Sequence, residues 1–128
     1  METSGDKYIS FEKLEVYKLA RALSKIAWSI YVSLDWQTKK VLGDQFIAST
    51  DSVGANIAEG YSRFHYLDKI KFMYNARASL SESMHWIDLF KERFLVVGET
   101  HFEYINLARK TEIKLNNFIS AMYKSKNK

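Results

Sequence analysis

Apolar residues recur every three or four positions along most of this chain, which is the spacing of one face of an α-helix. The first series begins at Phe11 and continues to Leu34, and the second covers about residues 38–64. Further series occupy about residues 68–97 and 100–123. No sustained alternation of apolar and polar residues occurs, and no Asn-Gly or Asp-Gly hairpin signal is present. The pattern therefore predicts four long helices and no β-sheet.

Residues typical of helix ends stand near these boundaries. Three of the helices are preceded by short side chains that can accept a hydrogen bond from the first turn. The expected N-cap residues are Ser10, Asp35 or Thr38, and Asp68. Gly98 is expected to end the third helix, because glycine readily adopts the left-handed conformation that follows a C-terminus. Thr100 followed by Glu103 matches a capping box for the fourth helix.

The joins between these helices are short, so neighbouring helices must run in opposite directions. We therefore expect an all-α protein, an antiparallel up-down-up-down four-helix bundle that residues 1–128 form as a single domain. The ends, about residues 1–9 and 124–128, are expected to be disordered or frayed. The absence of proline favours uninterrupted helices, and the absence of cysteine excludes disulfides and thiolate metal sites. No apolar run approaches the ~20 residues that span a bilayer, so we expect a cytoplasmic protein.

The formal net charge of +4 is concentrated near the C-terminus. Residues 1–64 carry eight basic and eight acidic side chains, whereas residues 65–128 carry eleven and seven. Three of those eleven are Lys124, Lys126 and Lys128, without which the net charge falls to +1. A tail of this kind is typical of a solvated chain end, and it can also contact the phosphates of a nucleic acid.

Basic and aromatic residues also gather around the join between the second and third helices. They are Tyr61, Arg63, Phe64, His65, Tyr66, Lys69 and Lys71. Nucleic-acid bases stack on aromatic rings while Lys and Arg contact phosphates, so this group and the lysine tail are a candidate site for single-stranded RNA. The alternative is that the end of a helical hairpin packs its aromatic rings and exposes its charges.

The helices carry more apolar residues than a single stripe requires. The additional residues are Val16, Leu19, Ile26 and Trp28 in the first helix, Phe72, Trp86 and Leu89 in the third, and Phe102, Tyr104 and Phe118 in the fourth. A monomeric bundle rarely exposes so much contiguous apolar surface. We therefore interpret these residues as a subunit interface.

Two segments place small and polar residues inside predicted helices, namely residues 52–60 (SVGANIAEG) and 76–82 (ARASLSE). Small residues allow close approach of two helices, and buried polar groups need partners. The residues of this candidate network are Asn56, Glu59, Arg77, Ser79 and Glu82. We interpret it as an interhelical network in which losing either glutamate leaves a buried charge unpaired. The alternative is a polar pocket or a contact with nucleic acid.

These two segments resemble the signature of the 23S rRNA-intervening sequence protein family. The resemblance covers about residues 11–97 and also includes Phe11, Leu14, Tyr17, Ala20, Leu42, Gln45 and Arg63. It implies a four-helix protomer assembled into a ring-like homopentamer, with no enzyme activity. The chain is also similar to the accessory protein of diversity-generating retroelements, a basic pentamer that works with RNA and a reverse transcriptase.

The sequence offers little for catalysis or metal binding. Glu82 and His85 have the spacing used in di-iron bundles, but no second pair of this kind exists. Nucleophile elbows and phosphate-binding loops are absent as well. We expect a non-catalytic, homo-oligomeric bundle without cofactor or metal that binds or scaffolds RNA or a nucleic-acid-processing partner. The alternative is a protein–protein interaction adaptor with no nucleic-acid contact.

Overall fold

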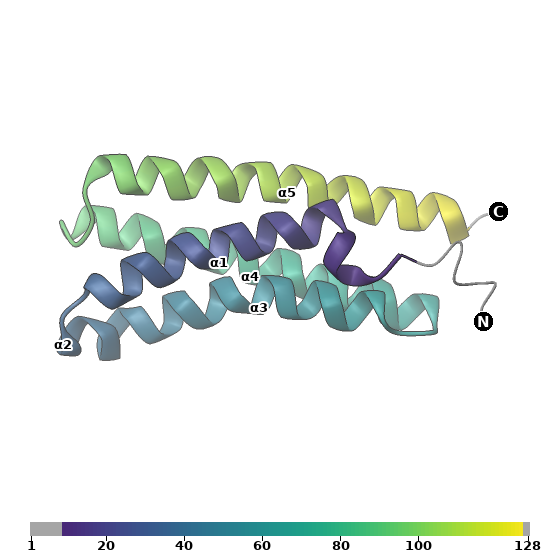
Figure 1. The fold of residues 1–128 in the computed structure, drawn as a ribbon, viewed down its shortest axis with the longest axis horizontal. Coiled ribbons are helices and arrows are strands. Elements are labelled where there is room, and N and C mark those ends of the chain that lie inside the picture. Colours follow the sequence, from purple (N-terminus) through teal and green to yellow (C-terminus); the bar gives the residue numbers. More distant parts are fainter. Residues whose placement is uncertain (1–8, 127–128) are drawn as a thin grey trace.

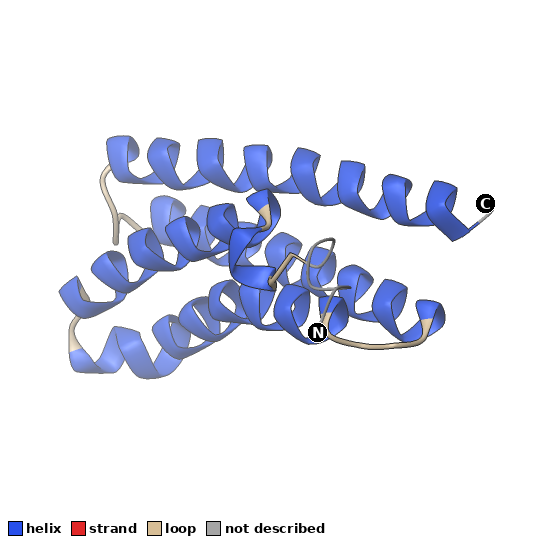
Figure 2. Ribbon diagram, turned by 45° about the vertical axis from the view of Figure 1, so that its right-hand side comes forward, coloured by secondary structure: helices blue, strands red, loops and turns tan. Residues whose placement is uncertain are grey.

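The computed structural model describes residues 9–126, and the regular structure in this range is entirely helical (Figure 2). The elements are the 3-10 helix η2 (Phe11–Lys13), α1 (Glu15–Ser33), α2 (Trp36–Thr38), the π-helix η3 (Lys39–Gly43), α3 (Asp44–Tyr61), α4 (Tyr66–Glu92) and α5 (Gly98–Lys126). The predicted all-α class is confirmed. Within residues 9–126, no helix is both long and apolar enough to cross a membrane.

The four long helices α1, α3, α4 and α5 lie side by side and run alternately in opposite directions (Figure 1). Helices α1 and α4 occupy opposite corners of the bundle, and each packs against both α3 and α5. The α3–α4 join and the C-terminal turns of α5 lie at the same end of the bundle, on the right in Figure 1.

The predicted second helix is built from three consecutive helical segments, α2, η3 and α3. Asp35 caps it, because its Oδ1 accepts the N–H of Thr38 at 2.8 Å. This bond with the Thr38 backbone lowers the pKa of the Asp35 carboxyl. The π-helical turn of η3 was not expected from the sequence, and α3 ends at Tyr61 rather than at Phe64.

Two predicted helix starts are displaced by a few residues. Ser10 precedes the short helix η2, and α1 begins only at Glu15. The N-cap of α4 is His65, so Asp68 lies in the first turn instead of capping it. There its negative charge still interacts favourably with the positive end of the helix dipole.

The join between α4 and α5 corrects the predictions for two residues. Gly98 is the first residue of α5 rather than the end of α4, and Thr100 lies inside the first turn of α5 rather than capping it. Helix α5 also continues through Lys126, beyond the position where fraying was expected.

A phenylalanine takes the left-handed position that was expected for Gly98. Phe94 has a φ of 58°. Its N–H donates to the carbonyl of Lys91 at 3.1 Å, and the N–H of Leu95 donates to the carbonyl of Phe90 at 2.8 Å. These two bonds define a Schellman C-cap, a motif that normally uses glycine at the left-handed residue.

Replacing Phe94 by glycine should therefore stabilise the protein by about 1 kcal/mol, because the left-handed conformation is costly for a residue with a Cβ. The Phe94 side chain is 93% exposed, so little packing is lost. Arg93→Gly is the control, since Arg93 has a φ of −97° and should lose about 0.5–1 kcal/mol. Urea unfolding measures both effects. A Phe94→Gly protein less stable than the parent would contradict the C-cap assignment.

Three aromatic residues from three helices meet at the centre of the core. The Phe46 ring centre lies 5.0 Å from that of Phe90 and 5.2 Å from that of Tyr104, and all three residues are fully buried. The Tyr104 hydroxyl bonds Thr50 Oγ1 at 2.7 Å, and Thr50 Oγ1 donates to the carbonyl of Phe46 at 3.0 Å. This contact ties α5 to α3 through polar groups that water does not reach.

Most of the apolar residues that the sequence suggested for a subunit interface instead belong to the core of the protomer. Val16, Leu19 and Tyr104 are buried. Several others are partly buried and pack against the same core, namely Ile26, Trp86, Leu89 and Phe118. Phe72 is half-buried. Of the suggested set, Trp28 and Phe102 are largely exposed, at 56% and 64%. Each helix contacts two neighbours and so needs a wider apolar stripe than a single contact would.

Candidate nucleic-acid interface

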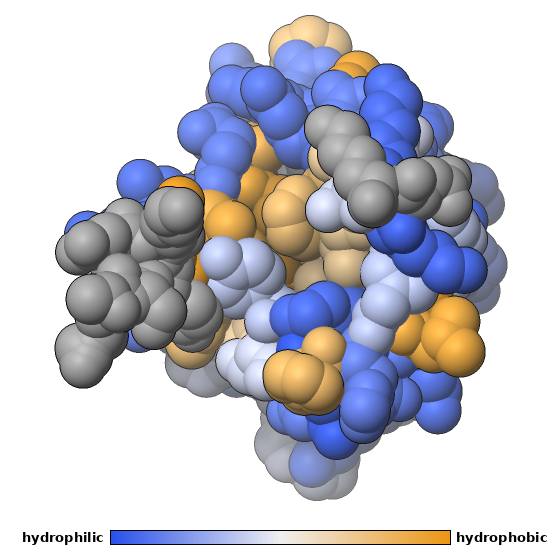
Figure 3. Space-filling model, turned by 90° about the vertical axis from the view of Figure 1, so that its right-hand side faces the viewer, coloured by the Kyte–Doolittle hydropathy of each residue, from blue (hydrophilic) through white to orange (hydrophobic). Residues whose placement is uncertain are grey.

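The α3–α4 join and the last turns of α5 form one end of the molecule, here called the hairpin end (residues 61–71 and 123–126). Figure 3 views this end, where hydrophilic surface surrounds a more apolar centre. Lys126 Nζ lies 5.3 Å from the centre of the Tyr66 ring, which is 6.2 Å from the ring of Tyr123. The structure thus brings part of the basic tail beside the aromatic and basic residues of the join.

Two of the aromatic rings suggested for base stacking are covered by cations of the protein itself. Lys69 Nζ donates to the carbonyl of Tyr61 at 2.9 Å and lies 5.6 Å from the centre of its ring. Desolvation lowers the pKa of the Lys69 ammonium and raises that of the Tyr66 hydroxyl. The Tyr66 hydroxyl is buried and has no hydrogen-bond partner within residues 9–126. Both tyrosines therefore pack the end of the bundle.

The open aromatic ring of the hairpin end belongs to Phe64, which is 90% exposed and meets His65 edge to face at 5.2 Å. His65 is exposed and precedes α4 as its N-cap residue. Arg63 is exposed but pairs with Glu59 at 2.6 Å, and its guanidinium lies 4.9 Å from the Phe72 ring centre. Phe64 is therefore better placed than Tyr61 or Tyr66 to stack on a base.

Three lysines of the hairpin end present their charge to solvent. Lys71 on α4 and Lys124 on α5 are exposed, and so is Lys126, whose ammonium also covers the Tyr66 ring. Lys128 lies outside the described residues. The candidate phosphate contacts are therefore Lys71, Lys124 and Lys126.

A tyrosine pair that was not predicted from the sequence fastens α5 to α4. The hydroxyls of Tyr74 and Tyr123 are hydrogen-bonded to each other. Beside them, Arg77 lies 4.9 Å from the Tyr74 ring centre and donates to Asn116 Oδ1 at 3.0 Å. One signal in the sequence was Tyr123 itself, because an aromatic residue directly before the lysine tail suggests that this part of α5 packs against the bundle.

The five residues of the candidate polar network do not form one network. Ser52 joins two of them, because Asn56 Nδ2 donates to its carbonyl and to its Oγ at 2.8 and 2.9 Å, and Ser79 Oγ donates to the same Oγ at 3.1 Å. This small α3–α4 cluster is partly buried. Arg77 instead reaches Asn116 on α5.

The two glutamates of that proposed network are exposed, which corrects the expectation that they are buried. Glu59 pairs with Arg63 in the next turn of the chain, and Glu82 Oε2 accepts the indole N–H of Trp86 at 3.0 Å. Both contacts link residues four apart and do not join helices. Replacing either glutamate should therefore cost far less than the few kcal/mol expected for a buried charge.

Among residues 9–126, no group of three or more His, Cys, Asp or Glu side chains is placed to hold a metal ion. His85 meets the Trp86 ring edge to face at 4.9 Å. The spacing of Glu82 and His85 therefore does not bring a third ligand of these types to the pair.

Comparison with known proteins identifies a family and a similar solved structure. The model of the 23S rRNA-intervening sequence protein family matches residues 12–117. A similar solved structure is that of a protein of unknown function from the S23 ribosomal protein family of Bacteroides thetaiotaomicron. The two share 22% identity with a TM-score of 0.77, over 82% of this chain and 95% of that one. No curated protein matches the chain. The similarity to the retroelement accessory protein stays a prediction. Since the family model covers most of the chain, this protein belongs to the 23S rRNA-intervening sequence protein family.

Proposed function

We propose that this protein is a non-catalytic, homo-oligomeric helical bundle of the cytoplasm that binds or scaffolds RNA or a nucleic-acid-processing partner. The observation that carries the proposal is that Lys71, Lys124, Lys126 and the open ring of Phe64 are all exposed at one end of the bundle, the hairpin end. Lysines at such a surface attract phosphates, and an exposed ring can stack on a base. The family name, which refers to 23S rRNA, supports RNA as the nucleic acid.

Assembly strengthens this proposal, because one protomer offers few contacts. A pentamer is the favoured state, and it repeats the hairpin end five times. Repeated sites can raise the apparent affinity by ~10²-fold or more when one RNA reaches several of them. The exposed Phe102 side chain supports contacts between subunits.

Binding to a single-stranded RNA should be largely electrostatic and should weaken steeply between ~50 and ~200 mM salt. Lys124→Gln combined with Lys126→Gln should reduce the magnitude of the salt slope by about 1.4 for each protomer that contacts the strand, since each contact to single-stranded nucleic acid contributes ~0.7. Phe64→Ala should weaken binding about fivefold or more if a base stacks on this ring. Fluorescence anisotropy with a labelled homopolymer measures both effects.

The matched control is Lys110→Gln with Lys114→Gln, two exposed lysines of the same helix that lie outside the hairpin end. This control should keep most of the salt slope. If the parent protein shows no binding at ~50 mM salt, RNA binding is rejected. If both lysine pairs have equal effects, the contact is a diffuse one and does not belong to the hairpin end.

A protein–protein interaction adaptor is the second candidate, and exposed apolar residues favour it. Trp36, Phe94 and Val97 are 74%, 93% and 67% exposed. They lie at the α1–α2 turn and in the α4–α5 join, at the end of the bundle opposite to the hairpin end (Figure 1). Apolar side chains in such positions are suited to contact another protein. Absence of RNA binding at low salt would leave this function as the better proposal.

A further inference from the structure

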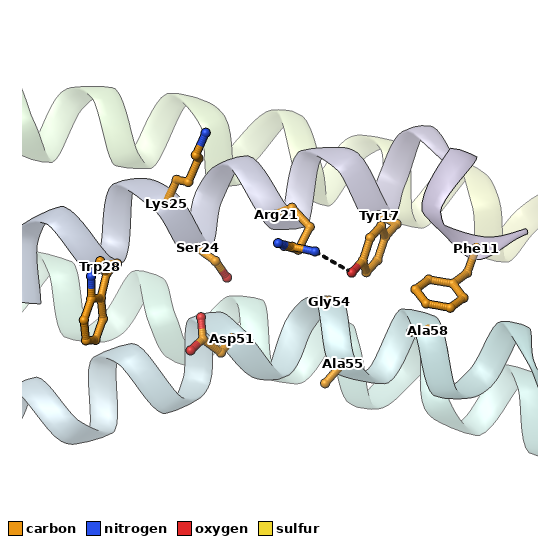
Figure 4. Close-up of a pocket in the computed structure, with 10 residues that line it drawn as sticks. All are labelled: Phe11, Tyr17, Arg21, Ser24, Lys25, Trp28, Asp51, Gly54, Ala55 and Ala58. Atoms are coloured by element: carbon orange, nitrogen blue, oxygen red, sulfur yellow. Dashed lines mark hydrogen bonds between the residues drawn. The ribbon is translucent and has the colours of Figure 1, made fainter.

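A groove of about 610 Å³ runs along the surface between α1 and α3 (Figure 4). Its α3 side is made of Asp51, Gly54, Ala55 and Ala58, and the last three belong to the segment that resembles the family signature. The side chains at these three positions are absent or a single methyl group, so they project little from α3 into the groove. The hollow therefore exists because this stretch of α3 has almost no side chains to fill it.

Aromatic rings and cations form the α1 side of the groove. Phe11 and Tyr17 stand near one end and Trp28 at the other (Figure 4). Between them lie Arg21, which donates one N–H to the Tyr17 hydroxyl at 2.9 Å, and Lys25 at the rim. Both cations are exposed, and so is most of Trp28. Cations and aromatic rings together along an open groove are the arrangement with which proteins hold single-stranded nucleic acid.

The groove leads toward the hairpin end. Its Phe11 end lies beside Ala58 (Figure 4), three residues before α3 ends at Tyr61, which is the first residue of the hairpin end. A strand bound by the lysines of the hairpin end is thus close to the mouth of the groove.

We propose that the α1–α3 groove is a second binding segment for single-stranded RNA, continuous with the hairpin end. This inference rests on the proposed RNA-binding function and adds the surface along which the strand runs. Trp28 stacks on Tyr31 with one face and provides its other face as a stacking surface. Arg21, whose guanidinium lies 5.8 Å from the Tyr17 ring centre, and Lys25 contact phosphates. Asp51, the carboxylate that lines the groove near Trp28, opposes the strand and limits affinity there.

The charge of the groove favours RNA over a second copy of this chain as the occupant. Lys25 and Asp51 line it, and lysine and aspartate are depleted at subunit interfaces. Phosphates can pair with Arg21 and Lys25 without requiring either side chain to be desolvated.

The decisive experiment is anisotropy with labelled poly-U on three groove variants at several salt concentrations. Arg21→Gln with Lys25→Gln should weaken binding about tenfold at low salt and reduce the salt slope by about 1.4. Ala55→Gln should weaken binding by filling the hollow. Asp51→Asn should tighten binding about two- to fivefold, because it removes a like charge from the path of the phosphates.

Matched controls separate the groove from general effects. Lys110→Gln with Lys114→Gln removes two exposed cations outside the groove, and Ala48→Gln changes an exposed alanine of α3 that does not line it. Each control should reduce the affinity for poly-U less than the corresponding groove variant does. Circular dichroism melting verifies that each variant folds.

Three results would overturn the groove proposal. If the groove variants bind RNA like their controls while the parent binds, the groove is rejected and the proposed function stands. If the parent does not bind at all, both are rejected. If the groove variants change the mass of the assembly by light scattering and the controls do not, the groove is a subunit interface.

Discussion

Replacing Tyr104 by alanine should destabilise the bundle by about 3–5 kcal/mol, the range expected when a buried aromatic residue leaves a cavity. Tyr104 is fully buried, packs against Phe46 and bonds Thr50 Oγ1 at 2.7 Å. Tyr104→Phe keeps the ring and removes only the hydroxyl, so it should cost about 1 kcal/mol. Urea unfolding at neutral pH measures both variants.

The burial of Tyr104 should also make the stability of the protein depend on pH. Burial raises the pKa of Tyr104 to about 12, above the usual value of about 10 for tyrosine. As the pH rises from 10 to 12, the unfolded chain loses this proton while the folded protein keeps it. The unfolded state then binds fewer protons, so stability falls, by about 2–3 kcal/mol when the change is complete.

Comparison with Tyr104→Phe isolates this effect, because the other ionisable groups remain in both proteins. The parent should be more stable at pH 8 and should lose that advantage as the pH approaches 12. Parallel stability curves for the two proteins over this range would contradict the burial of the Tyr104 hydroxyl against Thr50.

Gly60→Ala should destabilise the protein by about 1–3 kcal/mol, because α3 and α4 approach closely at this glycine. A Cβ at Gly60 would lie 2.7 Å from Phe72 Cβ, 2.9 Å from Met73 Cε and 3.1 Å from the carbonyl oxygen of Lys69. Two of these atoms are a Cβ and a backbone oxygen, which cannot move without shifting α4.

Gly54→Ala is the matched comparison and should be neutral or stabilising by up to about 1 kcal/mol. Its Cβ would lie 3.6 Å from Ala20 Cβ and from Tyr17 Cε1, which is ordinary contact, and alanine favours the helix. Thermal melting of both variants measures the difference. Equal melting temperatures would contradict the close approach at Gly60.

The sequence predicted the long helices well because the apolar period depends on many residues at once. It predicted their ends less well, since each end depends on one or two. Gly98 suited a C-cap by residue type, yet the chain turns four residues earlier at Phe94. The π-turn of η3 carried no signal in composition.

Polar partners were the least predictable feature, because a long side chain has several partners within reach. The sequence suggested that Glu59 and Glu82 bond across helices, but each found a partner four residues further along the chain. Such a partner is always near, whereas an interhelical one requires the right register. The sequence identified most residues of the hairpin end. It did not show that Lys126 covers the Tyr66 ring, because this contact requires α5 to continue to Lys126.

Native mass spectrometry with and without a single-stranded RNA tests whether this protein is a multimeric bundle that binds RNA. We expect a species several times the 15.0 kDa protomer, with five copies favoured, that takes up RNA at low salt and releases it at high salt. A 15.0 kDa monomer that takes up no RNA would show that both the assembly and the RNA binding are wrong.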